Sequence, residues 1–417
     1  MELLTTPTLV ESPFIIVKIG DYTFGAYKGS RRSAGEGFSS ELNVTYPNYM
    51  DSINITKVNG AVNTYTIKMV YGITQDSDPN LLEKVFGSIA DSWKITISYG
   101  DWNSPSFIYK EESAIITKIL SNIDFASNKI TYTLNCTSDS LQLISDIRDF
   151  PARKNKKPSD VIKELLYDRS YNLLDIFKGM KKESLVKSAN LIDSSDKRVD
   201  IPAVKSVNVL TYINYLVNSM IPIEDTDPNQ QIGTAKYYLT IVDDTKNKFG
   251  GAYFKVSKVG TAVGAIQSYD TYTVDIGYPG NDLVTGFNLK DDNSYAILYK
   301  YSGEVAQTNY INRIDNDGNM TTEFSPAITR NKTIMQPTAA NKSWWTQLTQ
   351  FPISATLTIK GLLRPAMLMS YVRVNSVFYG NKHSSSGLYI ITKQEDSISA
   401  SSGYRTTLTL QRIGGDE

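Results

Sequence analysis

The C-terminal quarter of the chain alternates apolar and polar residues, and this pattern constrains the fold more than any other feature. One face of the run at 404–412 carries Tyr404, Thr406, Leu408, Leu410 and Arg412. Residues 355–359 alternate in the same way before Gly361, and residues 388–392 do so after Gly387. A period of two is typical of a strand with one buried face. The sequence therefore predicts a series of half-buried strands over 355–413, broken by Gly and Pro.

Composition bounds the class of protein. At 417 residues the chain is expected to form about two to four domains, each large enough to bury a core. Lys plus Arg equals Asp plus Glu at 43 each, so no net field attracts nucleic acid, an anionic membrane or an acidic substrate. The 27 tyrosines are typical of sheets with one solvent-exposed face. The single histidine offers little for general acid–base chemistry.

The chain shows no targeting or membrane signal. Glu2 lies where a signal peptide requires positive charge, and no apolar core follows it, so we expect no cleaved leader. The longest apolar candidate, 362–374, contains two arginines and a proline and falls short of the roughly 18 residues that span a bilayer. We therefore expect no membrane-spanning segment.

The first third of the chain predicts one compact β-domain. A hairpin is expected at 14–27 around Gly20-Asp21, and a second around Asn59-Gly60, because Gly in a short turn between β-rich runs marks a hairpin. Asp78-Pro79 begins a predicted helix with an apolar stripe over 81–89. The further predicted strands are 93–99, 107–109, 114–120 and 129–137.

The middle of the chain mixes helices with short strands. A basic cluster, Arg153, Lys154, Lys156 and Lys157, precedes a predicted amphipathic helix that begins at Pro158-Ser159. We interpret the cluster as a solvated connector rather than a nucleic-acid site, because it has no interleaved aromatic residues. A second helix is predicted over 206–220, ended by Pro222, and short strands recur from 237 to about 312 before a polar linker near 331–341.

No catalytic or metal-binding constellation is found in the sequence. His383, the one histidine, lies in a small polar loop without a patterned nucleophile or carboxylate, and is interpreted as an exposed loop residue. Cys136 cannot form an intrachain disulfide and is interpreted as a small buried hydrophobic residue. One Cys and one His cannot supply the usual zinc ligands.

The acidic clusters also fail as sites. Asp315–Asn319 resembles the start of a calcium loop, but the ligand spacing is short and the final glutamate is missing, so it is read as a turn. The pairs Asp243-Asp244 and Asp291-Asp292 cannot each flank one glycosidic bond, because adjacent residues on a strand point to opposite faces. We therefore expect no catalytic, cofactor-binding or metal-binding residues and no enzymatic activity.

Trp344-Trp345, with Phe351 close behind, is the densest aromatic cluster. Exposed tryptophans often anchor a protein or sugar partner. The alternative, which we favour, is that they seal the junction where the chain re-enters a barrel.

The order of elements resembles that of baseplate hub proteins of contractile-tailed phages and related injection particles, the group that includes late control protein D. The resemblance is clearest at the C-terminal end, in the runs 357–361, 364–367, 371–377, 387–391 and 403–410. Two departures are Ala366 where the family commonly has Gly after Pro, and the polar stretch 394–396 where the family has a more apolar crossing. In the N-terminal half, 54–70 resembles the family's opening hairpin and 95–100 a strand ending in an aromatic-Gly pair.

The resemblance implies a mainly β, multi-domain hub fold with two tube-type β-barrels. Residues 1–145 would form the first barrel, 146–194 a mixed helical connector, 195–240 with 341–417 the second barrel, and 241–340 an inserted small β-domain. It further implies a homotrimeric ring in the virion tail baseplate, assembled in the host cytoplasm. Such a ring adapts a hexameric tail tube to a trimeric central spike, contacts other baseplate proteins, and has a lumen through which DNA can pass.

Two rival functions remain. A receptor-binding or distal tail protein would hold a host surface glycan with the 241–340 domain and Trp344-Trp345. A phage cell-wall-degrading enzyme is the third hypothesis, and the absence of a patterned catalytic set disfavours it.

Overall fold

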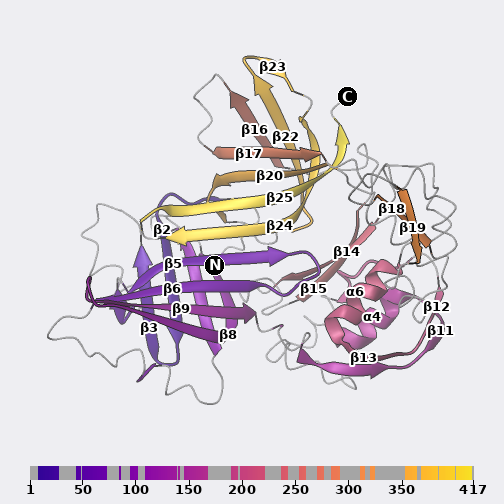
Figure 1. Cartoon of the computed structure of the whole chain (residues 1–417), viewed down its shortest axis with the longest axis horizontal. Coiled ribbons are helices and arrows are strands. Elements are labelled where there is room, and N and C mark those ends of the chain that lie inside the picture. Colours follow the sequence, from indigo (N-terminus) through magenta and orange to yellow (C-terminus); the bar gives the residue numbers. More distant parts are fainter. Residues whose placement is uncertain are drawn as a thin grey trace.

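The chain is mainly β, as the sequence predicts. The computed structural model describes residues 8–27, 44–47, 49–72, 84–85, 94–101, 109–138, 140, 145–167, 189–195, 198–220, 236–242, 253–259, 270–276, 283–291, 310–314, 320–324, 353–363, 368–383, 385–399 and 401–415. Within them, one 15-stranded sheet dominates, accompanied by two-stranded sheets and two helices (Figure 1).

The first β unit contains eight strands of this sheet. They are β2 (Pro13–Ile19), β3 (Tyr22–Tyr27), β4 (Tyr46–Pro47), β5 (Met50–Val58), β6 (Thr64–Gly72), β7 (Lys94–Asp101), β8 (Tyr109–Asp124) and β9 (Lys129–Ser138). Their order is β5-β6-β9-β8-β7-β2-β3-β4. Both predicted hairpins are confirmed, and their turns use glycine at positive φ, +58° at Gly20 and +70° at Gly60.

This part of the sheet rolls up around a core. Strands β2 and β3, at one end of the order, lie against β5 at the other (Figure 1). The alternating residues of each strand meet inside, as shown by the buried side chains of Val17, Ile55 and Leu134. Two members of the same core, Ile398 and Tyr404, come from the far end of the chain.

The second β unit is built from the C-terminal strands. They are β16 (Asp270–Ile276), β17 (Val284–Asp291), β20 (Ile353–Lys360), β22 (Tyr371–Phe378), β23 (Asn381–Lys382), β24 (Gly387–Ser399) and β25 (Gly403–Gly415). The order is β17-β20-β25-β24-β22-β16, with β23 beside β22. The predicted alternation of β25 is confirmed, because Tyr404, Thr406, Leu408 and Leu410 are all buried.

A helical unit packs beside the two β units. Helices α4 (Pro158–Tyr167) and α6 (Val209–Asn218) confirm the two predicted helices, and the Asn208 side chain caps α6 by accepting the Thr211 N–H at 2.7 Å. The helices share one core with three pairs of antiparallel strands. These pairs are β10 (Ile147–Phe150) with β13 (Val204–Asn208), β11 (Arg153–Lys156) with β12 (Val199–Ile201), and β14 (Lys236–Val242) with β15 (Tyr253–Val259).

The grouping of segments differs from the predicted division in two places. Most buried residues described in 195–240 belong to the core of the helical unit, whereas Tyr238 packs with Met369, Leu388 and Ile390 of the second β unit. Strands β16 and β17, from the predicted 241–340 insertion, pair with β22 and β20 and extend the second sheet. The local sequence pattern predicts a helix or strand, but it does not indicate which core buries the apolar face of that element. Both segments pack against partners that are distant in sequence.

Short pairs complete the described structure. Strand β1 (Thr8–Leu9) pairs with β21 (Leu362–Leu363), and β18 (Tyr310–Ile314) pairs with β19 (Met320–Phe324). The predicted helix over 81–89 is described only at residues 84–85, and the predicted polar linker near 331–341 lies outside the described residues. Neither described helix has the length and apolar character needed to cross a membrane.

Candidate functional site at the junction of the two β units

The β24–β25 hairpin belongs to both β units and joins them into one sheet. The first residues of β24 pair with β22, whereas residues 393–399 pair antiparallel with 52–58 of β5. Ile398 thereby lies opposite Ile53, and both side chains are buried in the core of the first unit. The two β units are therefore connected by backbone hydrogen bonds as well as by side-chain packing.

A β-bulge in β24 marks the point of crossing. The register with β25 shifts between Ile391 and Lys393, and the Thr392 hydroxyl donates to the Thr409 carbonyl at 3.3 Å. The Asn59 N–H donates to the Thr392 carbonyl at 3.0 Å. Because a bulge bends its strand and increases the local twist, it lets the hairpin leave the second unit and continue along β5.

The β5–β6 turn ties the helical unit to the same place. The Gly60 N–H donates to the Leu239 carbonyl, and the Asn214 amide donates to the Gly60 carbonyl, both at 2.8 Å. Leu239 belongs to β14 and Asn214 to α6. All three units thus meet at the residues around Gly60.

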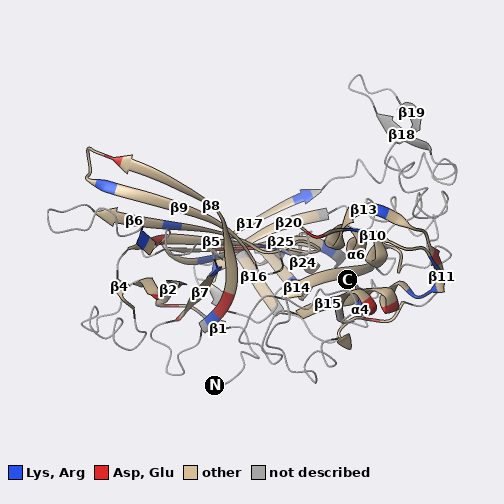
Figure 2. Ribbon diagram, turned by 90° about the horizontal axis from the view of Figure 1, so that it is seen from below, with Lys and Arg blue, Asp and Glu red and all other residues tan. Residues whose placement is uncertain are grey.

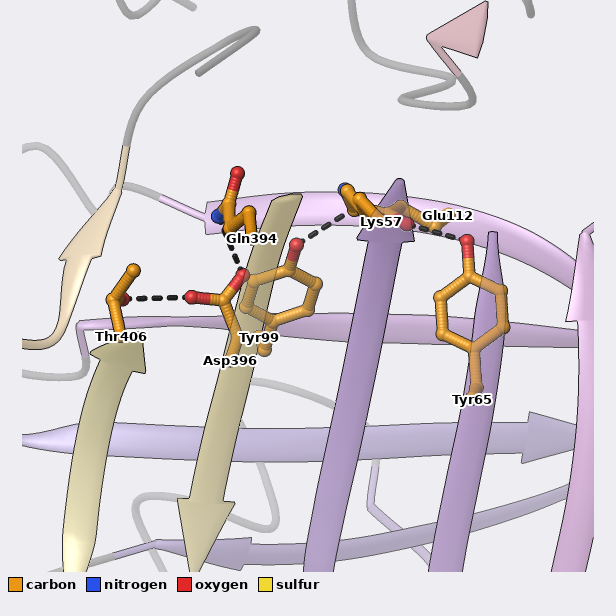
Figure 3. Close-up of polar contacts among 7 residues, drawn as sticks. All are labelled: Lys57, Tyr65, Tyr99, Glu112, Gln394, Asp396 and Thr406. Carbon is orange, nitrogen blue, oxygen red and sulfur yellow. Dashed lines mark hydrogen bonds and ion pairs between the residues drawn. The ribbon is translucent and has the colours of Figure 1, made fainter. Parts of the chain in front are cut away.

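A polar cluster is buried in the first unit beside the junction (Figure 3). The Glu112 carboxylate on β8 forms an ion pair with Lys57 on β5. It also accepts hydrogen bonds from the hydroxyls of Tyr65 on β6, at 2.5 Å, and Tyr99 on β7, at 2.7 Å. One carboxylate therefore links four strands of the rolled sheet, of which β5 and β8 are not neighbours.

A second buried carboxylate comes from the hairpin itself. Asp396 on β24 accepts hydrogen bonds from the Gln394 amide at 2.6 Å and the Thr406 hydroxyl at 2.7 Å. Figure 3 shows Asp396 and Gln394 facing the same interior as Tyr99 and Glu112. The ring of Tyr404 packs edge-on against that of Tyr99, with centroids 6.3 Å apart.

The pKa values of the two carboxyl groups shift in opposite directions. Burial alone would raise the pKa of Glu112, but the charges of Lys57 and Lys110 and the hydrogen bonds from Lys57 and Tyr65 outweigh it, so this pKa is lowered. For Asp396, burial outweighs the nearby lysines and the hydrogen bonds from Thr406 and Gln394, and the pKa is raised. The surroundings therefore favour the anion of Glu112, whereas burial makes ionisation of Asp396 less favourable than in water.

The arrangement of this cluster fits a structural role. Glu112 and Asp396 are 0% and 1% exposed, so no substrate reaches either carboxyl group. Buried charges of this kind require specific partners, and removing one partner is costly. The cluster therefore favours one register of the β24–β25 hairpin on the first unit over its alternatives.

The two β units repeat the same order of strands. In the first unit the order is β5-β6-β9-β8-β7-β2, and in the second it is β17-β20-β25-β24-β22-β16. The strands correspond one to one in sequence order as well. Matched neighbours run in the same relative direction except in the last pair, which is antiparallel for β2 with β7 and parallel for β16 with β22. Strands β3 and β4 in the first unit and β23 in the second have no counterpart in these orders.

The correspondence extends to individual residues. The sequence Ile-Ile-Thr-Lys occurs at 115–118 and at 390–393, and a register shift follows its second Ile in both hairpins. The Thr117 hydroxyl donates to the Asn135 carbonyl at 2.9 Å, as Thr392 does to Thr409. Shifts in β5, between Met50 and Ser52, and in β17, between Val284 and Gly286, also correspond. The repeated tetrapeptide is the sequence signal that could have revealed this duplication.

The structure confirms the interpretations of Cys136 and His383. Cys136 is 2% exposed on β9, and burial raises the pKa of its thiol to about 12. His383 is exposed in a loop, where its Nδ1 lies 2.8 Å from the Ser385 hydroxyl and its ring packs against Phe378.

The basic cluster contributes mainly to local structure. Arg153 binds both carboxylate oxygens of Glu164 on α4, at 2.7 and 2.8 Å, and Lys157 donates to the Ser194 hydroxyl at 3.2 Å. Lys154 and Lys156 are exposed, as expected of a solvated connector.

The remaining candidates are not placed by the structure. Asp243-Asp244, Asp292, Asp315–Asn319, Trp344-Trp345 and Phe351 lie outside the described residues, whereas Asp291 ends β17. Within the described ranges, no group of three or more His, Cys, Asp and Glu side chains could hold a metal ion.

The chain is similar to solved structures of tail proteins and of a secretion-system component. No protein-family model and no curated protein matches the chain. A tail protein from Neisseria meningitidis MC58 is 11% identical, with 96% of each chain covered and a TM-score of 0.48. The 43 kDa tail protein of prophage MuSo2 from Shewanella oneidensis is 11% identical over 96% of this chain and 98% of that one, with a TM-score of 0.49. An E. coli component of the type VI secretion system is 9% identical over 88% and 75%, with a TM-score of 0.43. Because these identities and TM-scores are low, the function is inferred from the chain's own geometry.

Proposed function

We propose that the chain is a structural tail protein, a baseplate hub whose three copies form a ring. The observation that carries this proposal is the repeated strand order of the two β units, joined edge to edge through β24 and β5. Two similar units per chain give three copies six similar positions around an axis. Such a ring has threefold symmetry and presents approximate sixfold symmetry.

The duplication suits a symmetry adapter. One face of the ring can dock a hexameric tail tube through six similar surfaces, and the other can hold a trimeric central spike through surfaces that occur once per chain. The helical unit occurs once per chain and distinguishes the two β units. Other baseplate proteins would bind outside the ring, and DNA would pass through its lumen in the virion.

The role is mechanical, and no bond is made or broken. The buried carboxylates of Glu112 and Asp396 are engaged by Lys57, Tyr65, Tyr99, Gln394 and Thr406 inside the core. Asp396 and Gln394 of the β24–β25 hairpin face the same interior as Glu112, and this shared packing favours a fixed relation between the two units.

Negative-stain electron microscopy of the purified full-length chain tests the proposal. We expect rings with threefold symmetry and six peripheral lobes, and a trimer mass by light scattering. A monomer that persists at high protein concentration would contradict the ring.

A further inference from the structure

The β8–β9 hairpin projects from the body of the molecule (Figure 2). All residues of β8 from Leu120 to Asp124 are exposed, and so are the turn residues that follow. Three large apolar side chains lie there, Leu120, Ile123 and Phe125, with exposed fractions of 46%, 52% and 84%. A two-stranded ribbon with both faces in water is at best marginally stable by itself, so this segment is suited to bind a partner.

Strand β17 presents a sheet edge in the second unit. It pairs with β20 on one side, and among the residues that the structure describes no strand is hydrogen-bonded to its other edge, although β16 lies close to it. Leu289 of this strand is 39% exposed, while Phe287 is partly buried against the core of the second unit. An open edge of this kind is a template for pairing with another strand.

Exposed apolar residues concentrate on these two surfaces. Six large apolar side chains are exposed in the described part of the chain, and four of them, Leu120, Ile123, Phe125 and Leu289, belong to the hairpin or to β17. Burying them would remove apolar area from water, which favours association.

The first β unit shows what occupies the equivalent edge. Strand β5 corresponds to β17, and its edge is covered by residues 393–399 of β24. Strand β24 in turn corresponds to β8, so residues 118–124 are the equivalents of residues 393–399. We infer that residues 118–124 of one copy pair antiparallel with β17 of a second copy of this chain, an inference that rests on the proposed ring.

The duplication fixes the register of this pairing. Ile398 lies opposite Ile53 and Ser397 opposite Asn54 within one chain. The corresponding pairs between copies are Ile123 with Phe287 and Asn122 with Asn288. Ile123 then enters the core of the neighbour's second unit, as Ile398 enters the core of the first.

This contact is head-to-tail, because it joins different surfaces of the two copies. Contacts of this type generate a closed ring when the rotation per subunit closes. Each chain then supplies one junction internally, β24 on β5, and one to its neighbour, β8 on β17.

Cysteine cross-linking in the full-length chain tests the register. Directly opposite residues have Cα atoms about 4.5–5.5 Å apart, within the range for a disulfide. We expect Asn122→Cys with Asn288→Cys in one chain to give covalent dimers and trimers on a non-reducing gel. The matched control, Asn54→Cys with Ser397→Cys, places the two cysteines opposite each other within one chain. Both new thiols should oxidise to an intrachain disulfide, so the band on the gel should stay at the mass of one chain. Shifting the second cysteine by two residues, Asn122→Cys with Lys290→Cys, should reduce cross-linking at least several-fold.

A charge placed at the predicted contact provides a second measurement. Ile123→Asp should weaken trimer formation at least tenfold, as measured by light scattering. The circular dichroism spectrum should stay unchanged, because Ile123 is half exposed in the single chain. The control Ile147→Asp, at a residue 65% exposed on the helical unit, should assemble normally.

The outcomes separate this inference from the proposed function. Trimers that neither cross-link through residues 122 and 288 nor respond to Ile123→Asp would overturn the strand pairing and leave the ring standing. A wild-type chain that stays monomeric at every concentration would overturn both.

Discussion

Lys57 on β5 and Glu112 on β8 form an ion pair across the interior of the first β unit, between strands that are not neighbours in the sheet. The Glu112 side chain is fully buried, and the Lys57 side chain is 12% exposed. The pair fixes the distance between two walls of the rolled sheet. It also lies beside β24, which pairs with β5 along residues 52–58.

Replacing Glu112 with Gln should destabilise the chain strongly, since it leaves the Lys57 charge nearly buried without its counter-ion. Removing one partner of a buried pair costs about 3–5 kcal/mol, measured as the change in free energy of unfolding in urea. Lys57→Met combined with Glu112→Gln should recover part of this loss, because no unpaired Lys57 charge remains and the amide oxygen still accepts a hydrogen bond from a tyrosine hydroxyl.

The control for this experiment is an exposed ion pair that involves β5, the strand of Lys57. Asp51 pairs with Lys68 at 3.4 Å, with side chains 40% and 49% exposed. Asp51→Asn should change the free energy of unfolding by less than about 1 kcal/mol. Equal effects of Asp51→Asn and Glu112→Gln would contradict the role given to the buried pair.

The opposite pKa shifts of the two carboxyl groups predict a dependence of stability on pH. The folded pKa of Asp396 is raised, so its contribution is fully present below the unfolded pKa and is lost as pH rises through the folded value. The folded pKa of Glu112 is lowered, so its contribution is present above the unfolded pKa and is lost as pH falls.

Asp396→Asn should therefore remove part of the fall in stability on the alkaline side of the unfolded aspartate pKa. The amide keeps an acceptor for the Thr406 hydroxyl and has no proton to lose. Unfolding in urea at a series of pH values measures the slope for both chains. An unchanged slope in Asp396→Asn would show that this carboxyl group ionises alike in the folded and unfolded states.

The local structure of the chain was largely predictable from the sequence. The turns at Gly20 and Gly60, the helices α4 and α6 and the alternation of β25 follow from short-range rules, since φ preferences and periodicity act within a few residues. The placement of β16 and β17 in the second sheet was not predicted, because β16 pairs with β22 across about 100 residues and pairing at that range leaves no periodic signal.

The contacts at the junction of the two β units could be predicted only in part from the sequence. The polar stretch 394–396 departs from an apolar crossing, and the structure shows why: Gln394 and Asp396 hydrogen-bond to each other inside the first unit. Nothing in the local sequence near Glu112 indicates that its partners come from β5, β6 and β7. Such a cluster is defined by tertiary packing, and rules that act over a few neighbouring residues cannot predict it.

Cys136 should be inert in the folded chain. Its side chain is 2% exposed, and burial raises the pKa of the thiol to about 12, so almost no thiolate is present at pH 8. Iodoacetamide should leave the native chain unmodified and alkylate it fully in urea, as measured by mass spectrometry. Rapid alkylation of the native chain at the same rate as of the unfolded chain would contradict the burial of β9.

Gly361 lies where only glycine fits against the junction. A Cβ at this position would be 2.1 Å from Cγ of Tyr404, a distance that atoms cannot adopt without a shift of the ring. The Gly361 N–H donates to the Tyr404 carbonyl, and its own carbonyl accepts from the Val10 N–H, both at 2.9 Å. The backbone is therefore held in place on both sides, and Tyr404 packs against Tyr99 in the first core.

Gly361→Ala should cost about 1–3 kcal/mol or more through overpacking, measured as the free energy of unfolding. Gly72→Ala, where no atom lies within 4 Å of the added Cβ, should change it by less than about 0.5 kcal/mol. Because the clash involves the ring, the cost of Gly361→Ala should shrink in a chain that also carries Tyr404→Leu, which a double-mutant cycle measures. Strict additivity of the two substitutions would show that Tyr404 does not set the requirement for glycine, and the close packing of β25 on residue 361 would have to be abandoned.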